Sequence, residues 1–534
     1  MKAILKHISI LSFILLLNFV LSACNNSSSD NLSKFTAIEY ENIPTVANID
    51  EYQAEVVKNG INNDDPVENG VVTCPYYTLT INNQKVQVYS TRCANSVHSF
   101  AWIDVEDAQN LVLNVKLELK NYHKNVVVLP ESSGVKATLE NNVVTCQITS
   151  LGSFSIAFDR KVEEALTLYV AQKEELNVPE GYSLKEFNPG TYKATETTFK
   201  DGETVYLFKK GVYNLSSIYL PSNSILYLEP GTYFNVVTES LQDRNAAIRS
   251  SGTKNIKICG RGLFDFSQSQ GGEAKFKGVF NFHNVSEITF SGITSINSNS
   301  WSVCFTDCDN VLVEKLMLLG YRTFSDGIMM SDCQDSLIRN NFVRTGDDAI
   351  EVKSTGSEGT SNMIYEYNAI WTDKARGYGC IYEANNSVKN VVFRNNSIGF
   401  ALATWTDDLG CCIVVMGDRR TTTWEDIHFE NIEIYISYHA LVNVTLEDSL
   451  GNGVNGGKAK DIYFENITAY RCYGLAARIL VQNGSTLGKV YLDNIRFNDK
   501  LLQESSLSNK DEVSVVHYSS SWAKSNLKIN TNIE

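Results

Sequence analysis

One stretch decides the fold of this chain, and it reads Ser325-Asp-Gly-Ile-Met-Met-Ser-Asp-Cys-Gln-Asp-Ser-Leu-Ile-Arg-Asn-Asn-Phe-Val-Arg-Thr-Gly-Asp-Asp-Ala-Ile-Glu-Val-Lys-Ser354. Asp326 and the pair Asp347-Asp348 each lead directly into a short apolar strand. Asp326-Gly-Ile aligns with Asp348-Ala-Ile at an offset of 22 residues, and Val303-Cys-Phe-Thr-Asp-Cys308 aligns with Ile328-Met-Met-Ser-Asp-Cys333 at an offset of 25. The chain therefore repeats itself here, and the repeat is expected to place the three aspartates on neighbouring rungs.

A phrase of apolar residues and asparagines recurs through the second part of the chain, at steps of 23 to 36 residues. No amphipathic helices separate the copies, which excludes helical repeats, and the marker residues of leucine-rich and WD repeats are missing. A parallel β-helix fits, with alternate residues pointing into the bore and loops of variable length on one face. The steps are counted on the second residue of each copy, which is Ile256, Ile288, Val311, Leu337, Met363, Val391, Ile427, Ile462 and Val490.

Length and composition indicate two β-rich domains. At 534 residues the chain is too long for one ordinary core, and it is 43% hydrophobic and 20% charged. Residues 35–175 show alternating strands separated by turn residues, which predicts a β-sandwich, and residues 176–534 carry the repeats. The expected fold is all-β, with a right-handed parallel β-helix preceded by an N-terminal β-sandwich. The net charge of −15 argues against nucleic acid, anionic lipid headgroups and polyanionic substrates.

The N-terminus has the form of an export signal. A basic segment, an apolar segment from Ile8 to Val20 and the sequence Leu21-Ser-Ala-Cys24 match a bacterial lipoprotein signal over residues 1–24. Residues 25–34 then form a polar tether. This predicts lipidation of Cys24 in a cell-envelope lipoprotein of a Gram-negative bacterium, in the outer membrane or periplasm, which meets the membrane only through its lipid. The alternative is a plain secretory signal cut near Ala23.

The remaining cysteines and the histidines suggest neither a disulfide scaffold nor a metal centre. Removing Cys24 leaves an odd number of cysteines, most of them inside apolar strands, and no Cys or His pair has zinc spacing. Cys308 and Cys333 occupy the same place in adjacent repeats, so the two thiols either stack or form a disulfide. We therefore expect no metal ion and no cofactor, and a monomeric protein.

The three aspartates have two main chemical uses if they point outward from a rigid sheet. They can bind a hard cation such as calcium. They can also divide into a general acid and a general base for glycoside hydrolysis, since like-charge repulsion raises the pKa of one of them. A third interpretation is purely structural, because Asp and Asn often terminate coils. Two such sites in register, one of them doubled, favour catalysis.

The motifs resemble those of the polygalacturonase and dextranase group of glycoside hydrolases. Family 28, the polygalacturonases, carries Asn-Thr-Asp, Asp-Asp, Gly-His-Gly and Arg-Ile-Lys. This chain has Phe324-Ser325-Asp326 and Gly346-Asp347-Asp348 for the first two and Gly377-Tyr378-Gly379 for the third, so the histidine is replaced. At the fourth, Cys412 and Val414 stand where the family's arginine and lysine grip the galacturonate carboxylate.

Family 49, the dextranases and isopullulanases, resembles the chain more closely. Its members also place a β-sandwich ahead of the β-helix. The resemblance rests on Gly211-Val-Tyr213, Leu228-Glu-Pro-Gly-Thr-Tyr233 and Asp347-Asp-Ala-Ile-Glu-Val-Lys353. It implies an inverting mechanism in which Asp347 is the general acid, while Asp326 and Asp348 hold and deprotonate the attacking water.

The missing basic pair and the negative charge predict a neutral α-linked polysaccharide or oligosaccharide as the substrate. The expected sugar-binding residues are Trp301, Tyr378, Arg376, Lys353 and Trp405. Three other functions remain open at this point: a polygalacturonase-like pectin hydrolase, a β-helix polysaccharide lyase and a glycan-binding lipoprotein without activity. A lyase would need calcium-binding acids beside an Arg or Lys base and an anionic substrate.

Overall fold

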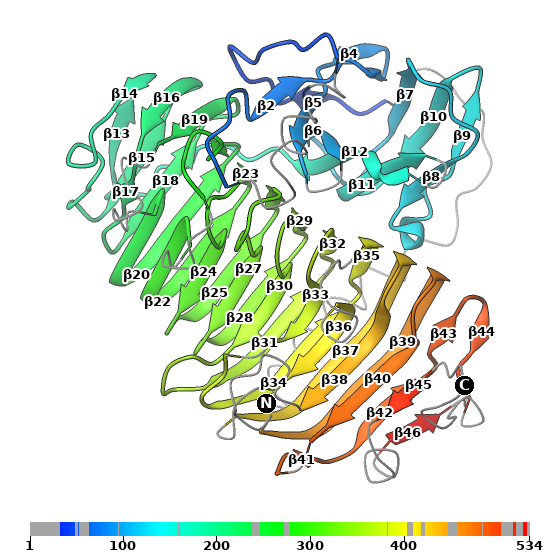
Figure 1. Cartoon of the computed structure of the whole chain (residues 1–534). Helices are drawn as coiled ribbons and strands as arrows, with labels where there is room; N and C mark the ends of the chain where they lie inside the picture. The colour runs from blue at the N-terminus through cyan, green and yellow to red at the C-terminus, as the bar shows by residue number, and fades with distance from the viewer. Residues whose placement is uncertain are drawn as a thin grey trace.

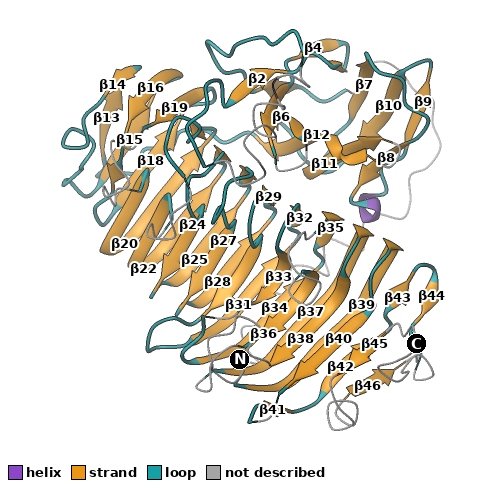
Figure 2. Ribbon diagram, in the orientation of Figure 1, coloured by secondary structure: helices purple, strands orange, loops and turns teal. Residues whose placement is uncertain are grey.

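The computed structural model describes residues 32–48, 52, 64–93, 96–158, 161–237, 246–271, 278–381, 383–402, 410–417, 422–446, 457–482, 484–503, 516–518 and 527–530. Cys24, the signal segment and most of the tether lie outside these residues. Within them, no helix is long and apolar enough to span a membrane. The described part is built almost wholly of strands, with one short 3-10 helix, η1 (Glu131–Ser133) (Figure 2).

The first domain is a sandwich of two sheets. One sheet contains β1 (Phe35–Ala37), β2 (Val71–Thr73), β5 (Tyr89–Arg92), β6 (Val97–Val105), β8 (Val126–Leu129), β11 (Gly152–Phe158) and β12 (Lys161–Gln172). The other contains β3 (Tyr77–Ile81), β4 (Gln84–Val86), β7 (Leu113–Leu119), β9 (Ala137–Glu140) and β10 (Val143–Ile148). β7 alternates strictly between buried and exposed residues, as expected for a strand with one face on a core.

From β13 onward the chain winds as a parallel β-helix, and the expected fold class is confirmed. Each full coil runs through three strand positions, here named faces A, B and C. Four long strands span two faces: β20 (Ile248–Gly260) and β22 (Phe280–Ser291) lie on A and B, and β37 (Thr423–Ser437) and β39 (Lys458–Cys472) lie on B and C. The expected domain boundary at residue 175 falls between the end of β12 and the start of β13.

The other strands each belong to one face. Face A contains β17 (Ile218–Tyr219), β24 (Val303–Thr306), β27 (Ile328–Ser331), β30 (Ile350–Lys353), β33 (Arg376–Cys380), β36 (Cys411–Met416), β38 (Ala440–Leu446), β40 (Ala477–Val481) and β45 (Val516–Tyr518). Face B contains β13 (Ser183–Phe187), β15 (Thr204–Phe208), β18 (Ser224–Leu228), β25 (Asp309–Glu314), β28 (Gln334–Arg339), β31 (Thr360–Glu366), β34 (Ser387–Arg394), β41 (Thr486–Leu487), β42 (Val490–Asp493) and β46 (Leu527–Asn530). Face C contains β14 (Gly190–Thr191), β16 (Gly211–Leu215), β19 (Thr232–Val236), β21 (Leu263–Asp265), β23 (Thr294–Ile296), β26 (Met317–Leu319), β29 (Phe342–Thr345), β32 (Ala369–Thr372), β35 (Ser397–Ala401) and β43 (Arg496–Phe497), which β44 (Lys500–Leu501) joins antiparallel.

The bore of the helix is filled by stacked residues of the same kind. Phe393 stacks on Phe429, and Phe429 on Phe464, with ring centroids 4.8 and 5.1 Å apart. The second residue of each repeated segment is buried except at one coil, where Ser336 rather than Leu337 pairs with Met363. In that coil the inward pattern is shifted by one residue, so that Ser336 and Ile338 point into the bore.

Face C carries the sandwich domain on its outer side (Figure 1). Trp371 and Phe342 of face C belong to one apolar cluster with Trp102 and Tyr169 of the sandwich. Arg261, in the turn from β20 to β21, is 2% exposed, and its Nε donates to Asp104 of the sandwich at 2.9 Å. Because this interface is apolar and also carries a buried ion pair, the sandwich is fixed against the β-helix rather than tethered to it.

The cysteine prediction is resolved in favour of stacking. Cys308 and Cys333 lie on adjacent coils as buried free thiols. Each Sγ donates to a backbone carbonyl, that of Phe282 for Cys308 and that of Phe305 for Cys333, both at 3.5 Å.

Candidate active site

Four residues of interest form one column along the turns that lead from face C into face A. The register of β24, β27, β30 and β33 places Trp301, Asp326, Asp348 and Arg376 on successive coils. The backbone bonds from Ser302 N to Asp326 O (2.7 Å) and from Gly327 N to Asp348 O (2.8 Å) hold this register. Neighbouring strands of a sheet lie about 4.8 Å apart, so the column brings the two aspartates within interaction distance.

Two glycines allow the aspartate turns to stack this closely. A Cβ at Gly327 would lie 2.1 Å from the carbonyl oxygen of Ala349, and one at Gly346 would lie 2.5 Å from that of Arg322. The turns are also bonded to each other, because Ser325 Oγ donates to Arg322 O at 2.6 Å and accepts from Gly346 N at 3.0 Å. The Asp326 turn and the Asp347-Asp348 turn therefore form one rigid unit.

The sandwich domain supports this unit through the segment ahead of β2. Asp64 Oδ1 accepts a hydrogen bond from Thr323 N at 3.0 Å. Arg322 donates to the carbonyl of Asp65 at 3.1 Å and to that of Ser267 at 2.8 Å, and its side chain is fully buried. The N-terminal domain thus has a structural role at the site, since it holds the turn that carries Asp326.

The aspartates lie in a nearly dry cluster. Asp326, Asp347 and Asp348 are 4%, 7% and 4% exposed. Burial and then the negative charge of Asp348 raise the pKa of Asp347 to about 7. Burial and then the charges of Asp347 and Glu351 raise the pKa of Asp326 well above its usual range. Both carboxyls can therefore hold protons near neutral pH.

Asp348 differs from the other two because Arg376 binds it directly. The guanidinium Nη1 of Arg376 lies 3.0 and 2.8 Å from the two carboxylate oxygens of Asp348, and the backbone N–H of Arg376 donates to Oδ1 at 3.0 Å. Charge-assisted hydrogen bonds of this kind stabilise the ionised carboxylate. Asp348 N in turn donates to Asp347 Oδ1 at 3.0 Å, which orients the neighbouring carboxyl.

Glu351 is a fourth acid of the cluster that the sequence analysis missed. Its side chain is fully buried, and its carboxylate lies within 4.8 Å of those of Asp326 and Asp348. Burial raises the pKa of Glu351 to about 8, against the lowering influence of Lys353. The signal was present in the sequence, because Ile350 and Val352 point into the bore and strand alternation therefore turns Glu351 and Lys353 outward.

Lys353 links this acid to the aromatic residue of the column. Its Nζ lies 3.1 Å from Glu351, 2.7 Å from Glu383 and 5.1 Å from the ring centre of Trp301. Trp301 and Lys353 therefore lie beside the carboxylates, as expected for residues that contact the substrate. Their sugar-binding role stays a prediction.

Two of the other expected sugar-binding residues face differently from the prediction. The ring of Tyr378 points into the bore, is fully buried, and donates its hydroxyl to the carbonyls of Asn368 and Ser397 at 2.8 and 3.1 Å. Its assignment as a sugar platform is wrong, because strand alternation places residue 378 inside. Arg376 is bound to Asp348 and fully buried, so it orients a carboxylate rather than a sugar hydroxyl. Trp405 lies outside the described residues.

The family's basic pair has no counterpart at its aligned position. Cys412 lies in the bore, where its thiol donates to Ser437 Oγ at 3.2 Å. Val414 belongs to a separate apolar cluster with Ile381, Cys411 and Met416. No cation therefore comes from these two positions.

Two exposed tyrosines that the sequence analysis missed extend the same row of turns. Tyr438 and Tyr473 lie in the turns that follow β37 and β39 and are 43% and 61% exposed. Their rings stack with centroids 5.1 Å apart and an interplanar angle of 19°. Large apolar groups held at a surface in this way mark a site of interaction.

Among the described residues, two groups of side chains could hold a metal ion, and the carboxylate cluster is one of them. Potential ligand atoms of Asp326, Asp348 and Glu351 lie within 4.8 Å of one another. Lys353 and Arg376 already supply positive charge there, so the cluster has neutralising partners without an ion. The expected absence of a metal stays a prediction.

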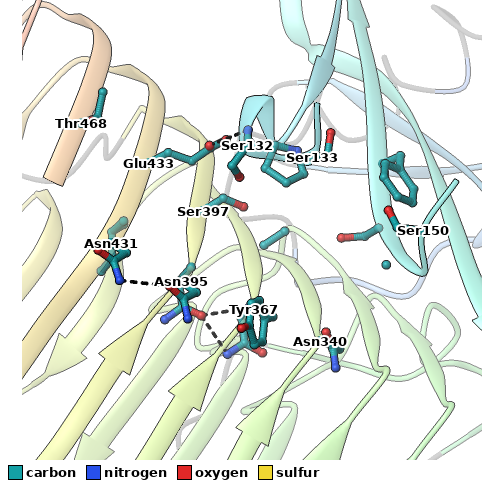
Figure 3. A pocket seen from close by; sticks show the side chains of 18 of the residues that line it. Ser132, Ser133, Ser150, Asn340, Tyr367, Asn395, Ser397, Asn431, Glu433 and Thr468 are labelled. Carbon is teal, nitrogen blue, oxygen red and sulfur yellow. Dashed lines mark hydrogen bonds between the residues drawn. The ribbon is translucent and has the colours of Figure 1, made fainter. Parts of the chain in front are cut away.

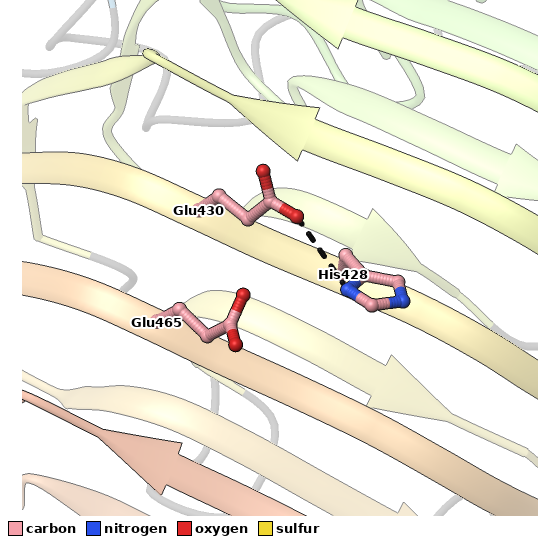
Figure 4. A group of neighbouring side chains, drawn as sticks. All are labelled: His428, Glu430 and Glu465. Atoms are coloured by element: carbon pink, nitrogen blue, oxygen red, sulfur yellow. Dashed lines mark ion pairs between the residues drawn. The ribbon is translucent and has the colours of Figure 1, made fainter. Parts of the chain in front are cut away.

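The second group, His428, Glu430 and Glu465, lies on the outer side of β37 and β39 (Figure 4). His428 Nδ1 is 3.5 Å from Glu430 and its Nε2 is 3.0 Å from Asp426. Its ring also stacks on Tyr463 at 4.4 Å. The carboxylates of Glu430 and Asp426 raise the pKa of His428, so these contacts form an ion-pair network at the surface.

Comparison with known proteins relates this chain to the glycosyl hydrolases. The model of the family described as Glycosyl hydrolases family 28 matches residues 195–516. A probable polygalacturonase from Vitis vinifera is 22% identical over 218 residues, which are 40% of this chain and 37% of that protein. An exopolygalacturonase from Arabidopsis thaliana is 23% identical over 199 residues, which are 35% of this chain and 42% of that protein. The chain thus matches about two fifths of the length of these curated relatives.

A solved structure shares the fold along nearly the whole chain. Dex49A from Penicillium minioluteum superimposes with a TM-score of 0.64 at 12% identity and covers 96% of this chain and 100% of its own. At this identity the likeness concerns the fold alone. The family model confirms the expected kinship with family 28, and the closer resemblance to family 49 stays a prediction.

Proposed function

We propose, from the premise that this chain belongs to family 28 of the glycosyl hydrolases, that its aspartate cluster hydrolyses glycosidic bonds with inversion. The observation that carries the proposal is the rigid stack of Asp326 on Asp348, with the protonatable Asp347 beside it. Inverting hydrolysis needs one carboxylic acid and one carboxylate on opposite sides of the bond, with room for water between them.

The proposed reaction is a single displacement. Asp347 gives its proton to the glycosidic oxygen as the bond from that oxygen to the anomeric carbon breaks. Water attacks the same carbon from the opposite face and loses a proton to the pair Asp326 and Asp348. One water is consumed, a hydroxyl is left on each fragment, and the enzyme ends with the proton moved from the acid to the base.

The electrostatics support this division of roles. Arg376 stabilises the charge of Asp348, which suits a base. The charge of Asp348 then helps to keep Asp347 protonated near pH 7, which suits an acid. We assign Glu351 and Lys353 to the support of Asp326, because Glu351 lies against it and the charge of Lys353 lowers its pKa.

We propose a neutral α-linked glycan as the substrate. Three described cations lie beside the cluster, and each already faces carboxylates: Lys353, Arg376 and Lys374, which interacts with Asp347, Asp64 and Asp373. The positions of the family's basic pair hold Cys412 and Val414. Tyr438 and Tyr473 add neutral aromatic surface along the same row of turns. A bound carboxylate would therefore meet mainly negative and apolar groups.

Polygalacturonate is the second candidate, because both curated relatives carry polygalacturonase names. A panel of dextran, pullulan, an α-galactan and polygalacturonate separates the two when reducing sugar release is measured. Release from a neutral glycan alone supports the proposal, and efficient release from polygalacturonate alone overturns the substrate class. Asp347→Asn serves as the inactive control, and Asp335→Asn, an exposed aspartate on the neighbouring β28, as the matched active one.

We also propose that the enzyme is exported and anchored by lipid on Cys24 in a Gram-negative cell envelope, where it meets external glycans. The support is the signal sequence with its basic and apolar segments and Leu21-Ser-Ala-Cys24. In Cys24→Ala we expect an unprocessed protein or one released to the soluble fraction. Normal cleavage and membrane partitioning of that variant would show that lipidation at Cys24 is not the anchor.

A further inference from the structure

The sandwich and the β-helix border a cavity of about 550 Å³ at the edge of face C opposite the aspartates (Figure 3). It lies along the turns from face B to face C, whereas the aspartates lie along the turns from face C to face A. The sandwich wall contributes Pro130, Ser132, Ser133 and residues 150–154, and the helix wall contributes residues of five successive coils.

One residue on the helix wall breaks the pattern of its row. On the five coils that line the cavity, the residue that begins the bend from face B to face C is left-handed, with φ of 53° at Asn340, 54° at Tyr367, 54° at Asn395, 52° at Asn431 and 55° at Asn466. Asparagine tolerates this conformation, whereas a bulky aromatic residue rarely adopts it. Backbone strain of this kind is often kept where a side chain has a function.

The ring of Tyr367 is held where a ligand could use it. It is 57% exposed although it lines the cavity, so one face of the ring is open. Leu151, 42% exposed, lines the cavity from the sandwich side. The cavity therefore offers apolar surface on both walls, which is typical of a small-molecule site.

Polar groups surround this apolar surface. The amides of Asn395, Asn431 and Asn466 form a ladder, with Nδ2 to Oδ1 distances of 3.1 and 3.0 Å. Serine hydroxyls face them from the sandwich, at Ser132, Ser133 and Ser150 (Figure 3). Aromatic and amide or hydroxyl groups in alternation match the apolar faces and hydroxyl edges of a sugar ring.

The charge of the lining argues against an anionic ligand. Among the described residues that line the cavity, Glu433 alone is charged, and its carboxylate accepts from the backbone N–H of Glu131 at 2.6 Å and of Ser132 at 2.8 Å. These bonds occupy the carboxylate and fix η1 of the sandwich to β37. The cavity is therefore rigid and has no lining cation for an anionic sugar.

We propose that this cavity is a second carbohydrate-binding site, which takes a neutral oligosaccharide or the end of a neutral polysaccharide with Tyr367 as its aromatic platform. Binding here needs none of the aspartates, so the site does not depend on the hydrolytic function. A chain held at the junction would keep the enzyme on its glycan between cleavage events.

The test measures glycan retention by the full-length protein in the Asp347→Asn background, so that hydrolysis does not consume the probe. Affinity electrophoresis is run in gels containing dextran, pullulan, an α-galactan or polygalacturonate. We expect retention by at least one neutral glycan, and a loss of about tenfold in affinity in Tyr367→Asn, the size expected for truncation of an aromatic anchor. Ser150→Trp, which fills the cavity from the opposite wall, should cause a similar loss.

Two controls distinguish this site from the aspartate cluster. Tyr122→Asn, which removes an exposed tyrosine outside the cavity, should retain full affinity. Tyr367→Asn in the otherwise unaltered enzyme should leave kcat/KM on a short soluble substrate unchanged. Unaltered retention in both cavity variants would overturn the proposal, as would retention by polygalacturonate alone or by no glycan of the panel. The unaltered enzyme could also hydrolyse none of the four glycans while retention still depends on Tyr367. That result would support this proposal and overturn the proposed substrate class.

Discussion

Two rows of turns border face C, and they differ in length as well as in chemistry. The B-to-C turns between β25 and β26, β28 and β29, β31 and β32, and β34 and β35 are all two residues long. The C-to-A turns that precede β27, β30 and β33 are eight, four and three residues long. The uniform row carries asparagines, Lys315 and Tyr367. The variable row carries the aspartates and Lys374, with Arg376 at the start of β33.

The difference shows how a repeat can hold two kinds of site. A two-residue turn fixes one left-handed residue outside and one residue inside, as with Asn340 and the inner Asn341, whose amide donates to Asn368 Oδ1 at 2.9 Å. That regular geometry suits a neutral ladder. Turns of variable length leave room for paired acids, supporting cations and bonds from another domain, such as Asp64 to Thr323.

The largest expected effect comes from a change in the variable row alone, at Asp347. Asp347→Asn removes the proton donor while preserving shape, so kcat should fall by about 10²–10⁴ on the natural glycan. A substrate with a good aryl leaving group needs little protonation, and it should restore Asp347→Asn far more than Asp326→Asn. Steady-state kinetics of both variants on both substrates measure this, with circular dichroism as the folding control. A fully active Asp347→Asn would remove the acid assignment.

A smaller effect concerns the pH dependence of activity, which the charged groups of the variable row set through the pKa values of the acid and the base. Asp347 must be protonated to act, so activity should fall as pH rises through about 7. The base must be ionised, and the charge of Lys353 lowers the pKa of Asp326 against the burial that raises it. In Lys353→Met that influence is lost, so the acidic limb of kcat/KM should move to higher pH. A limb that stays in place or moves to lower pH would show that Lys353 does not act on Asp326.

The smallest expected effect comes from a change in the uniform row, at Tyr367. Tyr367→Asn places in this turn the residue that its neighbours use, and relief of the left-handed strain should stabilise the protein by about 1 kcal/mol. Asn395→Tyr, the reverse change one coil away, should destabilise it by a similar amount. Urea unfolding of the two variants beside the parent gives both values. If Tyr367→Asn is destabilising instead, packing of the ring outweighs the strain, and the functional reason for Tyr367 weakens.

The repeats in the sequence predict which residues stack on successive coils, because the spacing between the repeats sets the register of the strands. The alignment of Asp326 with Asp348, and of Trp301 with Asp326, is the register that the strands adopt. The same register shows why the prediction for Tyr378 failed. Tyr378 pairs with Ile350, and both Ile350 and Cys380, two residues further along the strand, point into the bore.

Other features depend on contacts between distant segments, which no local pattern encodes. Asp64 reaches the Asp326 turn from another domain, and the cavity exists only because the sandwich covers face C. Glu351 was visible as an outward residue of a strand, but its role follows from the coil that places it against Asp326. The strain at Tyr367 likewise appears only once the turns are stacked.

The anomeric configuration of the first product tests the central claim most directly. If Asp347 protonates the leaving oxygen while water is activated by Asp326 and Asp348, water attacks without a covalent intermediate. Proton NMR of an α-linked substrate, recorded within minutes and before mutarotation, should then show the β-anomer of the new reducing end. Accumulation of the α-anomer instead would mean retention, and it would contradict the assignment of these three aspartates.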